Sequence, residues 1–79
     1  MEGRELLRTV ALIEADRHVP RERVFQALAE SFTRAYQLIH GDRPVTTVID
    51  RKTGEVRLHV EREDGTVEVV HPTRLGRRG

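Results

Sequence analysis

Apolar side chains recur every three or four residues through the first half of the chain, the spacing of helices that bury one face. We predict a first helix over about residues 2–17 and a second over about residues 20–39. His18-Val19-Pro20 breaks the pattern, because the residue before a proline avoids helical angles and proline is tolerated where a helix begins. Gly41 is expected to end the second helix. The first helix has its apolar stripe at Leu6, Val10 and Ile13, with Leu7 and Ala11 beside it.

The second helix carries a longer apolar stripe, made of Val24 or Phe25, Leu28, Phe32, Ala35 or Tyr36, and Ile39. Phe32 lies in the middle of this stripe, so we expect its ring to face the sheet and belong to the core. Apolar residues also extend beyond one stripe and cover more of the helix than a small core requires. We therefore expect a partner-binding surface or a homodimer contact on this helix. The residues concerned are Phe25, Phe32, Tyr36, Leu38 and Ile39.

After the second helix the apolar pattern changes to a period of two, which is typical of half-buried strands. Strands are predicted over about residues 45–50, 55–62 and 66–70. Between the first two, the Asp50 carboxylate can accept hydrogen bonds from amides of the turn, and Gly54 can supply a positive φ. The predicted fold class is therefore α+β, with two helices packed on one face of a small three-stranded antiparallel sheet.

The second hairpin is predicted from Asp64-Gly65, a strong signal for a two-residue turn. That turn pairs Val60 with Val69 and Arg62 with Val67, and it sets Glu61 opposite Glu68. With this register, one face of the sheet carries Leu58, Val60, Val67 and Val69. We expect one domain over residues 1–70, followed by a flexible basic tail over residues 71–79.

Composition excludes several classes of function. The chain has 79 residues, with 14 basic and 13 acidic side chains, and this balance argues against a dedicated DNA-binding domain. It has no cysteine and no apolar run long enough to cross a membrane, so we expect a cytoplasmic protein. In the terminal tail, Arg74, Arg77 and Arg78 have no acidic neighbour and are candidates for nucleic-acid contact.

Neither catalysis nor a cofactor is predicted. Ser31, the chain's serine, lies within the second helix without a visible partner, and the carboxylates lie among arginines on polar faces. The histidines share no spacing typical of metal ligands, and the expected register places two of them, His59 and His71, on opposite faces of the sheet. We therefore expect no metal site and interpret the histidines as solvent-facing. The four are His18, His40, His59 and His71.

Several segments at fixed intervals resemble a known family. They are Val19-Pro20-Arg21-Glu22 at a helix start, then Phe25-x-Ala27-Leu28-x-x-Ser31, then Ala35-Tyr36, then Ile49-Asp50-Arg51-Lys52-Thr53-Gly54-Glu55-Val56. Over roughly residues 6–60 this order is similar to the N-terminal domain of the bacterial transcription elongation factor NusA. The S1 and KH domains of that family, which bind RNA, would need a far longer chain.

The resemblance implies a non-enzymatic module that docks on RNA polymerase near the RNA exit channel, at the β flap tip or at the C-terminal domains of the α chains. Such a module promotes pausing, termination or antitermination. We expect the contacts on the exposed side of the helical pair, with Arg23, Arg34, Tyr36 and Leu38 as candidates.

Two departures from the family pattern matter. Family members often carry Lys or Arg after the Ala-Tyr pair, facing nascent RNA, whereas this chain has Gln37-Leu38-Ile39, so direct RNA binding is expected to be weak or absent. The family domain also continues past the second strand, so this chain is either a shortened free-standing relative or a piece of something larger. The alternative function is a small RNA- or ribosome-binding protein that uses its sheet face and arginine tail.

Overall fold

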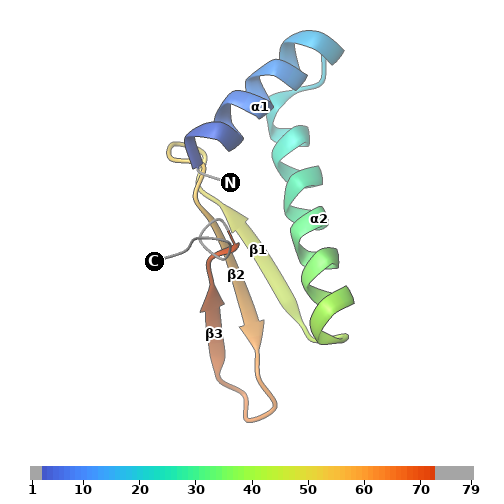
Figure 1. Cartoon of the computed structure of the whole chain (residues 1–79), viewed down its shortest axis with the longest axis vertical. Coiled ribbons are helices and arrows are strands. Elements are labelled where there is room, and N and C mark those ends of the chain that lie inside the picture. The colour runs from blue at the N-terminus through green and yellow to red at the C-terminus, as the bar shows by residue number, and fades with distance from the viewer. Residues whose placement is uncertain (1–2, 73–79) are drawn as a thin grey trace.

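A computed structural model describes residues 3–72 of the chain. Two helices, α1 (Gly3–Arg17) and α2 (Arg21–His40), precede three strands, β1 (Val45–Ile49), β2 (Val56–Glu61) and β3 (Val67–Val70). The strands form one antiparallel sheet in the order β1-β2-β3 (Figure 1). The α+β class predicted from the sequence is confirmed, and each element lies within two residues of its predicted bounds.

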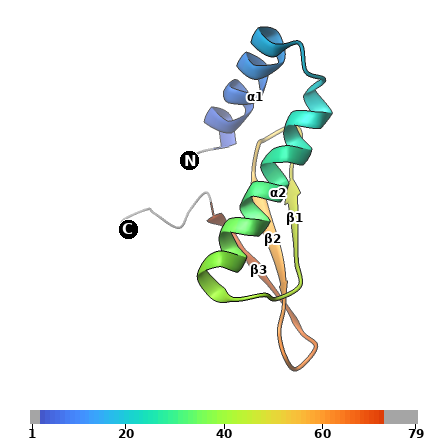
Figure 2. The same cartoon turned by 90° about the vertical axis from the view of Figure 1, so that its right-hand side faces the viewer.

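The two helices meet the sheet in different ways. α2 runs alongside β1, and α1 packs against α2 at the end of the sheet where the first hairpin turns (Figures 1 and 2). Between the helices, His18 adopts a positive φ of 56° and donates its backbone N–H to the Glu14 carbonyl, which caps the end of α1. This left-handed residue lets the chain reverse and begin α2 after Pro20.

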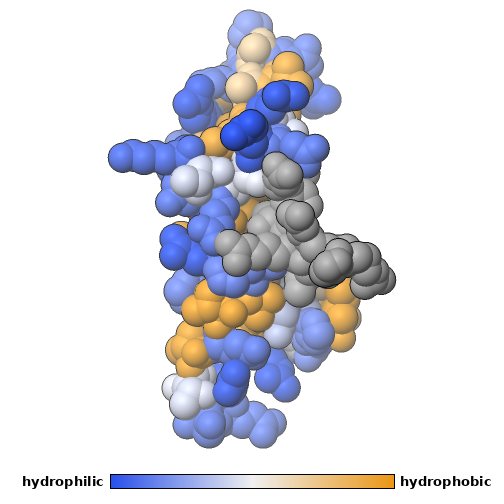
Figure 3. Space-filling view, turned by 60° about the vertical axis from the view of Figure 1, so that its left-hand side comes forward, coloured by the Kyte–Doolittle hydropathy of each residue, from blue (hydrophilic) through white to orange (hydrophobic). Residues whose placement is uncertain are grey.

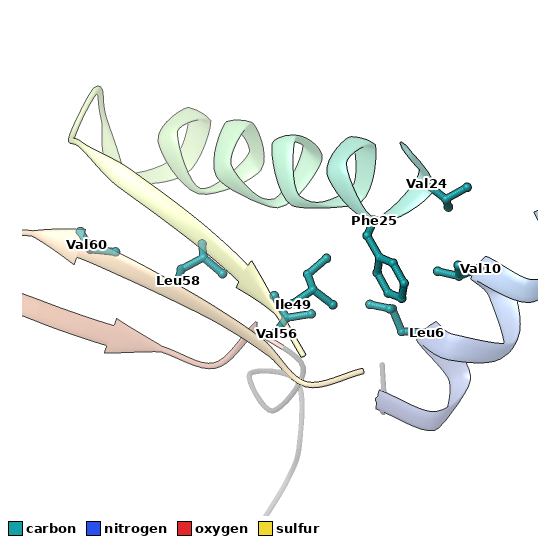
Figure 4. Packing of buried hydrophobic residues seen from close by; sticks show 8 residues of the cluster. All are labelled: Leu6, Val10, Val24, Phe25, Ile49, Val56, Leu58 and Val60. Carbon is teal, nitrogen blue, oxygen red and sulfur yellow. The ribbon is translucent and has the colours of Figure 1, made fainter. Parts of the chain in front are cut away.

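The core lies where α1, the first turns of α2 and the β1–β2 hairpin converge. Phe25 stands at its centre, 1% exposed, with its ring between Leu6 and Val10 of α1 and Ile49 of β1 (Figure 4). The buried side chains are Leu6, Val10, Val24, Phe25, Ile49, Val56, Leu58 and Val60. The alternation predicted for β1 and β2 is confirmed, because Ile49 pairs with Val56 and Thr47 with Leu58 on the face toward the helices.

The stripe predicted for α2 is correct in its first half and wrong at its end. Phe25, and not Phe32, is the fully buried aromatic; Phe32 is half-buried at the margin of the core. Ile39 is 76% exposed, although it was expected to continue the stripe. The reason is that α1 packs against the first half of α2, so the last turns of α2 lack that cover on one side (Figure 1).

The register predicted for the second hairpin is wrong by one residue. Val60 pairs with Glu68, and Glu61 with Val67. The turn contains three residues, because Arg62 N–H bonds to the Thr66 carbonyl while Gly65, with φ 88°, donates to the Arg62 carbonyl. The left-handed glycine closes this three-residue turn, and the Asp64-Gly65 pair is as suitable for such a turn as for a two-residue turn.

The one-residue shift moves side chains of β3 to the opposite face, since strand side chains alternate. Val67 and Val69 therefore lie on the outer face, away from the helices, and are 58% and 44% exposed. His59 pairs with Val69, so His59 shares that outer face. His71 follows Val69 by two residues, so the prediction that His59 and His71 point to opposite faces is also wrong.

Candidate protein interface

The first hairpin turn joins α2 through one arginine. Arg51 donates from Nε to the Glu22 carboxylate at 3.1 Å, with a second bond from Nη2, and from Nη1 to the Ile49 carbonyl at 2.6 Å. Its guanidinium carbon also lies 4.5 Å from the centre of the Phe25 ring. Arg51 therefore fixes the start of α2 against the end of β1, which orients the whole exposed length of the helix.

Charge effects follow this geometry. The hydrogen bonds from Arg51 lower the pKa of Glu22, and the same contact raises the pKa of Arg51 above its ordinary value. Sequence reasoning missed this pair, although both residues lie in the segments that resemble a known family, because Glu22 and Arg51 are 29 residues apart and neither segment indicates the contact.

The turn itself is closed by Asp50, as the sequence predicted. Its carboxylate accepts the backbone N–H of Thr53 at 2.9 Å and of Lys52 at 2.7 Å, and these two bonds lower the pKa of Asp50. Gly54 has the expected positive φ of 78°. In the second turn, the hydroxyl and the backbone N–H of Thr66 lower the pKa of Asp64 in the same way.

The lowered pKa of Asp50 predicts a stability that falls in acid. A carboxylate with a folded-state pKa below its unfolded value of 3.8 stabilises the fold above that value, and this contribution is lost as the pH falls through the folded-state pKa. Asp50→Asn should therefore reduce the dependence of the urea midpoint on pH below about 4. Asp42→Asn, an exposed aspartate before β1, serves as the matched control and should retain the parent dependence. An Asp50→Asn profile identical to the parent would contradict the assignment.

One side of α2 is exposed along its whole length. This outer face of α2 consists of Arg23, Ala27, Glu30, Arg34 and Leu38, all exposed, at spacings that return to the same side of a helix. Leu38 is 81% exposed and lies with Ala27 and Arg34 along one shallow depression. Within the described residues, neither Arg23 nor Arg34 forms an ion pair, so both guanidinium groups are available to a partner.

The structure separates the four predicted contact residues. Arg23, Arg34 and Leu38 lie on the outer face of α2, with Arg23 in the first turn of the helix and the other two near its end. Tyr36 lies on the inner side, half-buried against the core, and its ring is stacked near His40 at a centroid distance of 4.3 Å. The predicted nucleic-acid candidates Arg74, Arg77 and Arg78 lie outside the described residues.

Large apolar side chains are exposed at several places: Leu38 and Ile39 in the last turn of α2, Val67 and Val69 on the outer face of β3, Leu12 on α1 and Val48 on β1. On the face that Figure 3 shows, the larger orange areas lie in the lower half. Sequence reasoning had identified the apolar surplus on α2 but had assigned Ile39 to the core and Val67 and Val69 to the inner face.

Other kinds of site find little support in residues 3–72. No group of three or more His, Asp or Glu side chains in that range could hold a metal ion. His71 Nδ1 lies 3.3 Å from a Glu55 carboxylate oxygen, which is a contact between two half-buried side chains. In the same range, neither helix has the length and apolar character needed to cross a membrane.

The fold and the outer face of α2 define a small α+β domain that presents an exposed helix surface of the kind used in protein contacts. Residues 5–73 match the family model of the NusA N-terminal domain, which covers most of the chain, so the chain belongs to this family. It is a non-enzymatic family from a transcription elongation and termination factor. The chain has no detectable match among curated proteins or among solved structures.

Proposed function

We propose that this chain binds bacterial RNA polymerase near the RNA exit channel and thereby modulates pausing, termination or antitermination. Family membership over residues 5–73 supports this proposal. The observation that carries it is the outer face of α2, where Leu38, with 81% of its surface exposed, lies one turn after Arg34, which forms no ion pair within residues 3–72. The docking point would be the β flap tip or the C-terminal domain of an α chain of the polymerase.

The chemistry of this face defines what the partner must offer. Leu38 needs an apolar recess, because an exposed leucine gains from burial at about 25 cal/mol per Å² of apolar area. Arg23 and Arg34 need carboxylates, and arginine is enriched at protein interfaces because its planar group bonds carboxylates in pairs. Charges at the rim of such a contact should accelerate association more than they strengthen the final complex.

The proposal predicts that Leu38→Glu weakens capture of purified RNA polymerase. We expect a loss of about tenfold or more, the usual scale for losing an apolar anchor at the centre of an interface. Leu12→Glu is the matched control, since Leu12 is also highly exposed, at 64%, but lies on α1. Binding is measured by pull-down and by biolayer interferometry with the immobilised chain. Equal loss in both variants, or in neither, would contradict the assignment of the outer face of α2.

The alternative, RNA or ribosome binding by the sheet face, is less well supported. The outer face of the sheet carries Arg57 and His59 beside Glu61, with exposed valines around them. Phosphate binding needs an excess of cations and weakens steeply with salt. Titration of the chain with single-stranded RNA at two salt concentrations tests this alternative, and the result is compared with the polymerase pull-down. Tight, salt-sensitive RNA binding without capture of polymerase would favour this alternative and reject the proposal.

A further inference from the structure

The edge of β1 offers backbone hydrogen bonds that the sheet does not use. Asp50 N–H bonds to the Glu55 carbonyl, and the Pro44 carbonyl accepts the N–H of Glu61, so even-numbered residues of this segment point toward β2. In an antiparallel ladder the alternate residues point the other way. The N–H and C=O groups of Val45 and Thr47 therefore face the free edge. The Ile49 carbonyl fits this pattern, because it accepts a bond from the Arg51 side chain instead.

The sequence of β1 lacks the features that normally prevent strand addition. Edge strands are usually protected by lysine, proline, an inward-pointing charge or a bulge. β1 is Val45-Thr46-Thr47-Val48-Ile49, five residues without a charge or a proline, and its pairing with β2 is regular throughout. β3 is shorter and carries Glu68 in its middle, on the face toward the helices. The two edges of the sheet are therefore not equivalent.

A cleft runs beside this edge, with α2 as its opposite wall. It has a volume of about 490 Å³, and α2 runs antiparallel to β1 along it (Figures 1 and 2). A hydrogen bond of 2.6 Å between the Thr33 and Thr47 hydroxyls joins helix and strand. The residues that line the cleft are Ala29, Glu30, Thr33, Arg34 and Gln37 from α2, and Val45, Thr46 and Thr47 from β1.

We propose that this cleft binds an extended peptide segment of a partner protein, which adds as a fourth strand on the free edge of β1. In this mode the backbone bonds give affinity and the alternate side chains, which face the cleft, give specificity. A peptide brings only one strand to this edge, whereas a second copy of this chain would also bring a second helix against α2. The proposal does not require RNA polymerase to be the partner, although Glu30 and Arg34 belong both to this cleft and to the outer face of α2.

The charges on the wall specify the peptide further. Glu30 and Arg34 are exposed, one helical turn apart, and neither forms an ion pair within the described residues. Four helical residues advance about 6 Å and two strand residues about 6.7 Å, so side chains at positions i and i+2 of the peptide can face the two charges. A peptide antiparallel to β1 runs in the direction of α2. It should therefore carry a basic residue followed, two positions later, by an acidic one.

The test begins with selection of random linear ten-residue peptides on the whole chain. We expect enrichment of a basic-x-acidic triplet between β-branched residues. Thr47→Pro removes an N–H that points to the free edge and leaves the bonds to β2 intact, so it should weaken the selected peptide by about tenfold or more. Val69→Pro removes the equivalent outward-pointing N–H on the edge of β3 and should not change binding of the selected peptide. Thr47→Val, which replaces the hydroxyl by a methyl group and keeps the backbone N–H, should also retain binding.

Modified peptides and hydrogen exchange complete the experiment, even if Thr47→Pro does not fold. N-methylation of every second residue blocks the N–H groups along one edge of the selected peptide. Methylation along the edge that faces β1 should abolish binding, and methylation along the opposite edge should leave binding unchanged. Amide exchange should slow at Val45 and Thr47 and not at Val67 and Val69. The proposal is overturned if the selection enriches no peptide, or if methylation along either edge has the same effect. It is also overturned if the peptide protects amides of β3, or if the chain associates with itself through β1 in place of binding peptide.

Discussion

Phe25→Ala should remove the cooperative unfolding transition of this domain at room temperature. The ring is 1% exposed and fills the space between α1 and the β1–β2 hairpin. Truncation of a buried phenylalanine costs about 3–5 kcal/mol, because the apolar contacts are lost and a cavity is left. A chain of 79 residues has a total stability of roughly 4–12 kcal/mol on the usual per-residue scale, and small domains lie toward the low end.

Phe32→Ala is the matched comparison, since both phenylalanines lie on the same side of α2. Phe32 is half-buried at the margin of the core, so its truncation removes less apolar contact and should cost about 1–2 kcal/mol. Urea denaturation followed by circular dichroism separates the two variants. If Phe32→Ala unfolds the domain and Phe25→Ala does not, α1 crosses α2 at a different position along the helix in solution than in this structure.

The distinction between the two phenylalanines could not come from the periodicity of α2. Both belong to one wide apolar stripe, and the pattern gives the direction of the buried side but not the position along the helix where burial is deepest. That position depends on where α1 crosses, and the crossing brings Leu6 and Val10 against Phe25. The first pair of strands was predictable, because apolar residues alternate in both strands and their pairing must place the apolar side chains of both on the same face.

The second hairpin lacked such a constraint. β3 has valines at three of its four positions, so its composition does not identify a buried side. Its register follows from the turn, and Asp64-Gly65 is compatible with two turn lengths. The sequence could place Arg23, Arg34 and Leu38 on one helix face from their spacing of eleven and four residues. Tyr36 follows Arg34 by two residues, which by the same geometry puts it on the other side.

Another contact was invisible to sequence reasoning, namely the close approach of the start of α1 to the first hairpin turn. A Cβ built at Gly54 would lie 2.1 Å from the carbonyl oxygen of Gly3, and one at Gly3 would lie 2.2 Å from the carbonyl oxygen of Thr53. Backbone atoms cannot yield as a flexible side chain can. The two glycines therefore allow α1 to rest directly on the turn that Asp50 closes.

This contact predicts that Gly54→Ala destabilises the domain more than Gly65→Ala does. Both glycines have positive φ, 78° and 88°, so both substitutions introduce backbone strain of about 1–3 kcal/mol. Gly65 has no atom within 4 Å of a new Cβ, so its variant incurs the strain alone. At Gly54 the new methyl group must also push α1 away from the turn, which loosens the packing of Leu6 and Phe25 in the core.

Urea denaturation of the two variants gives the difference in free energy of unfolding, and amide chemical shifts show where it arises. Gly54→Ala should shift resonances along the start of α1, whereas Gly65→Ala should shift only the second hairpin. Because strain is common to both, any excess loss at Gly54 measures the contact with α1. Equal losses in the two variants, with the shifts of α1 unchanged, would mean that α1 does not rest on this turn in solution.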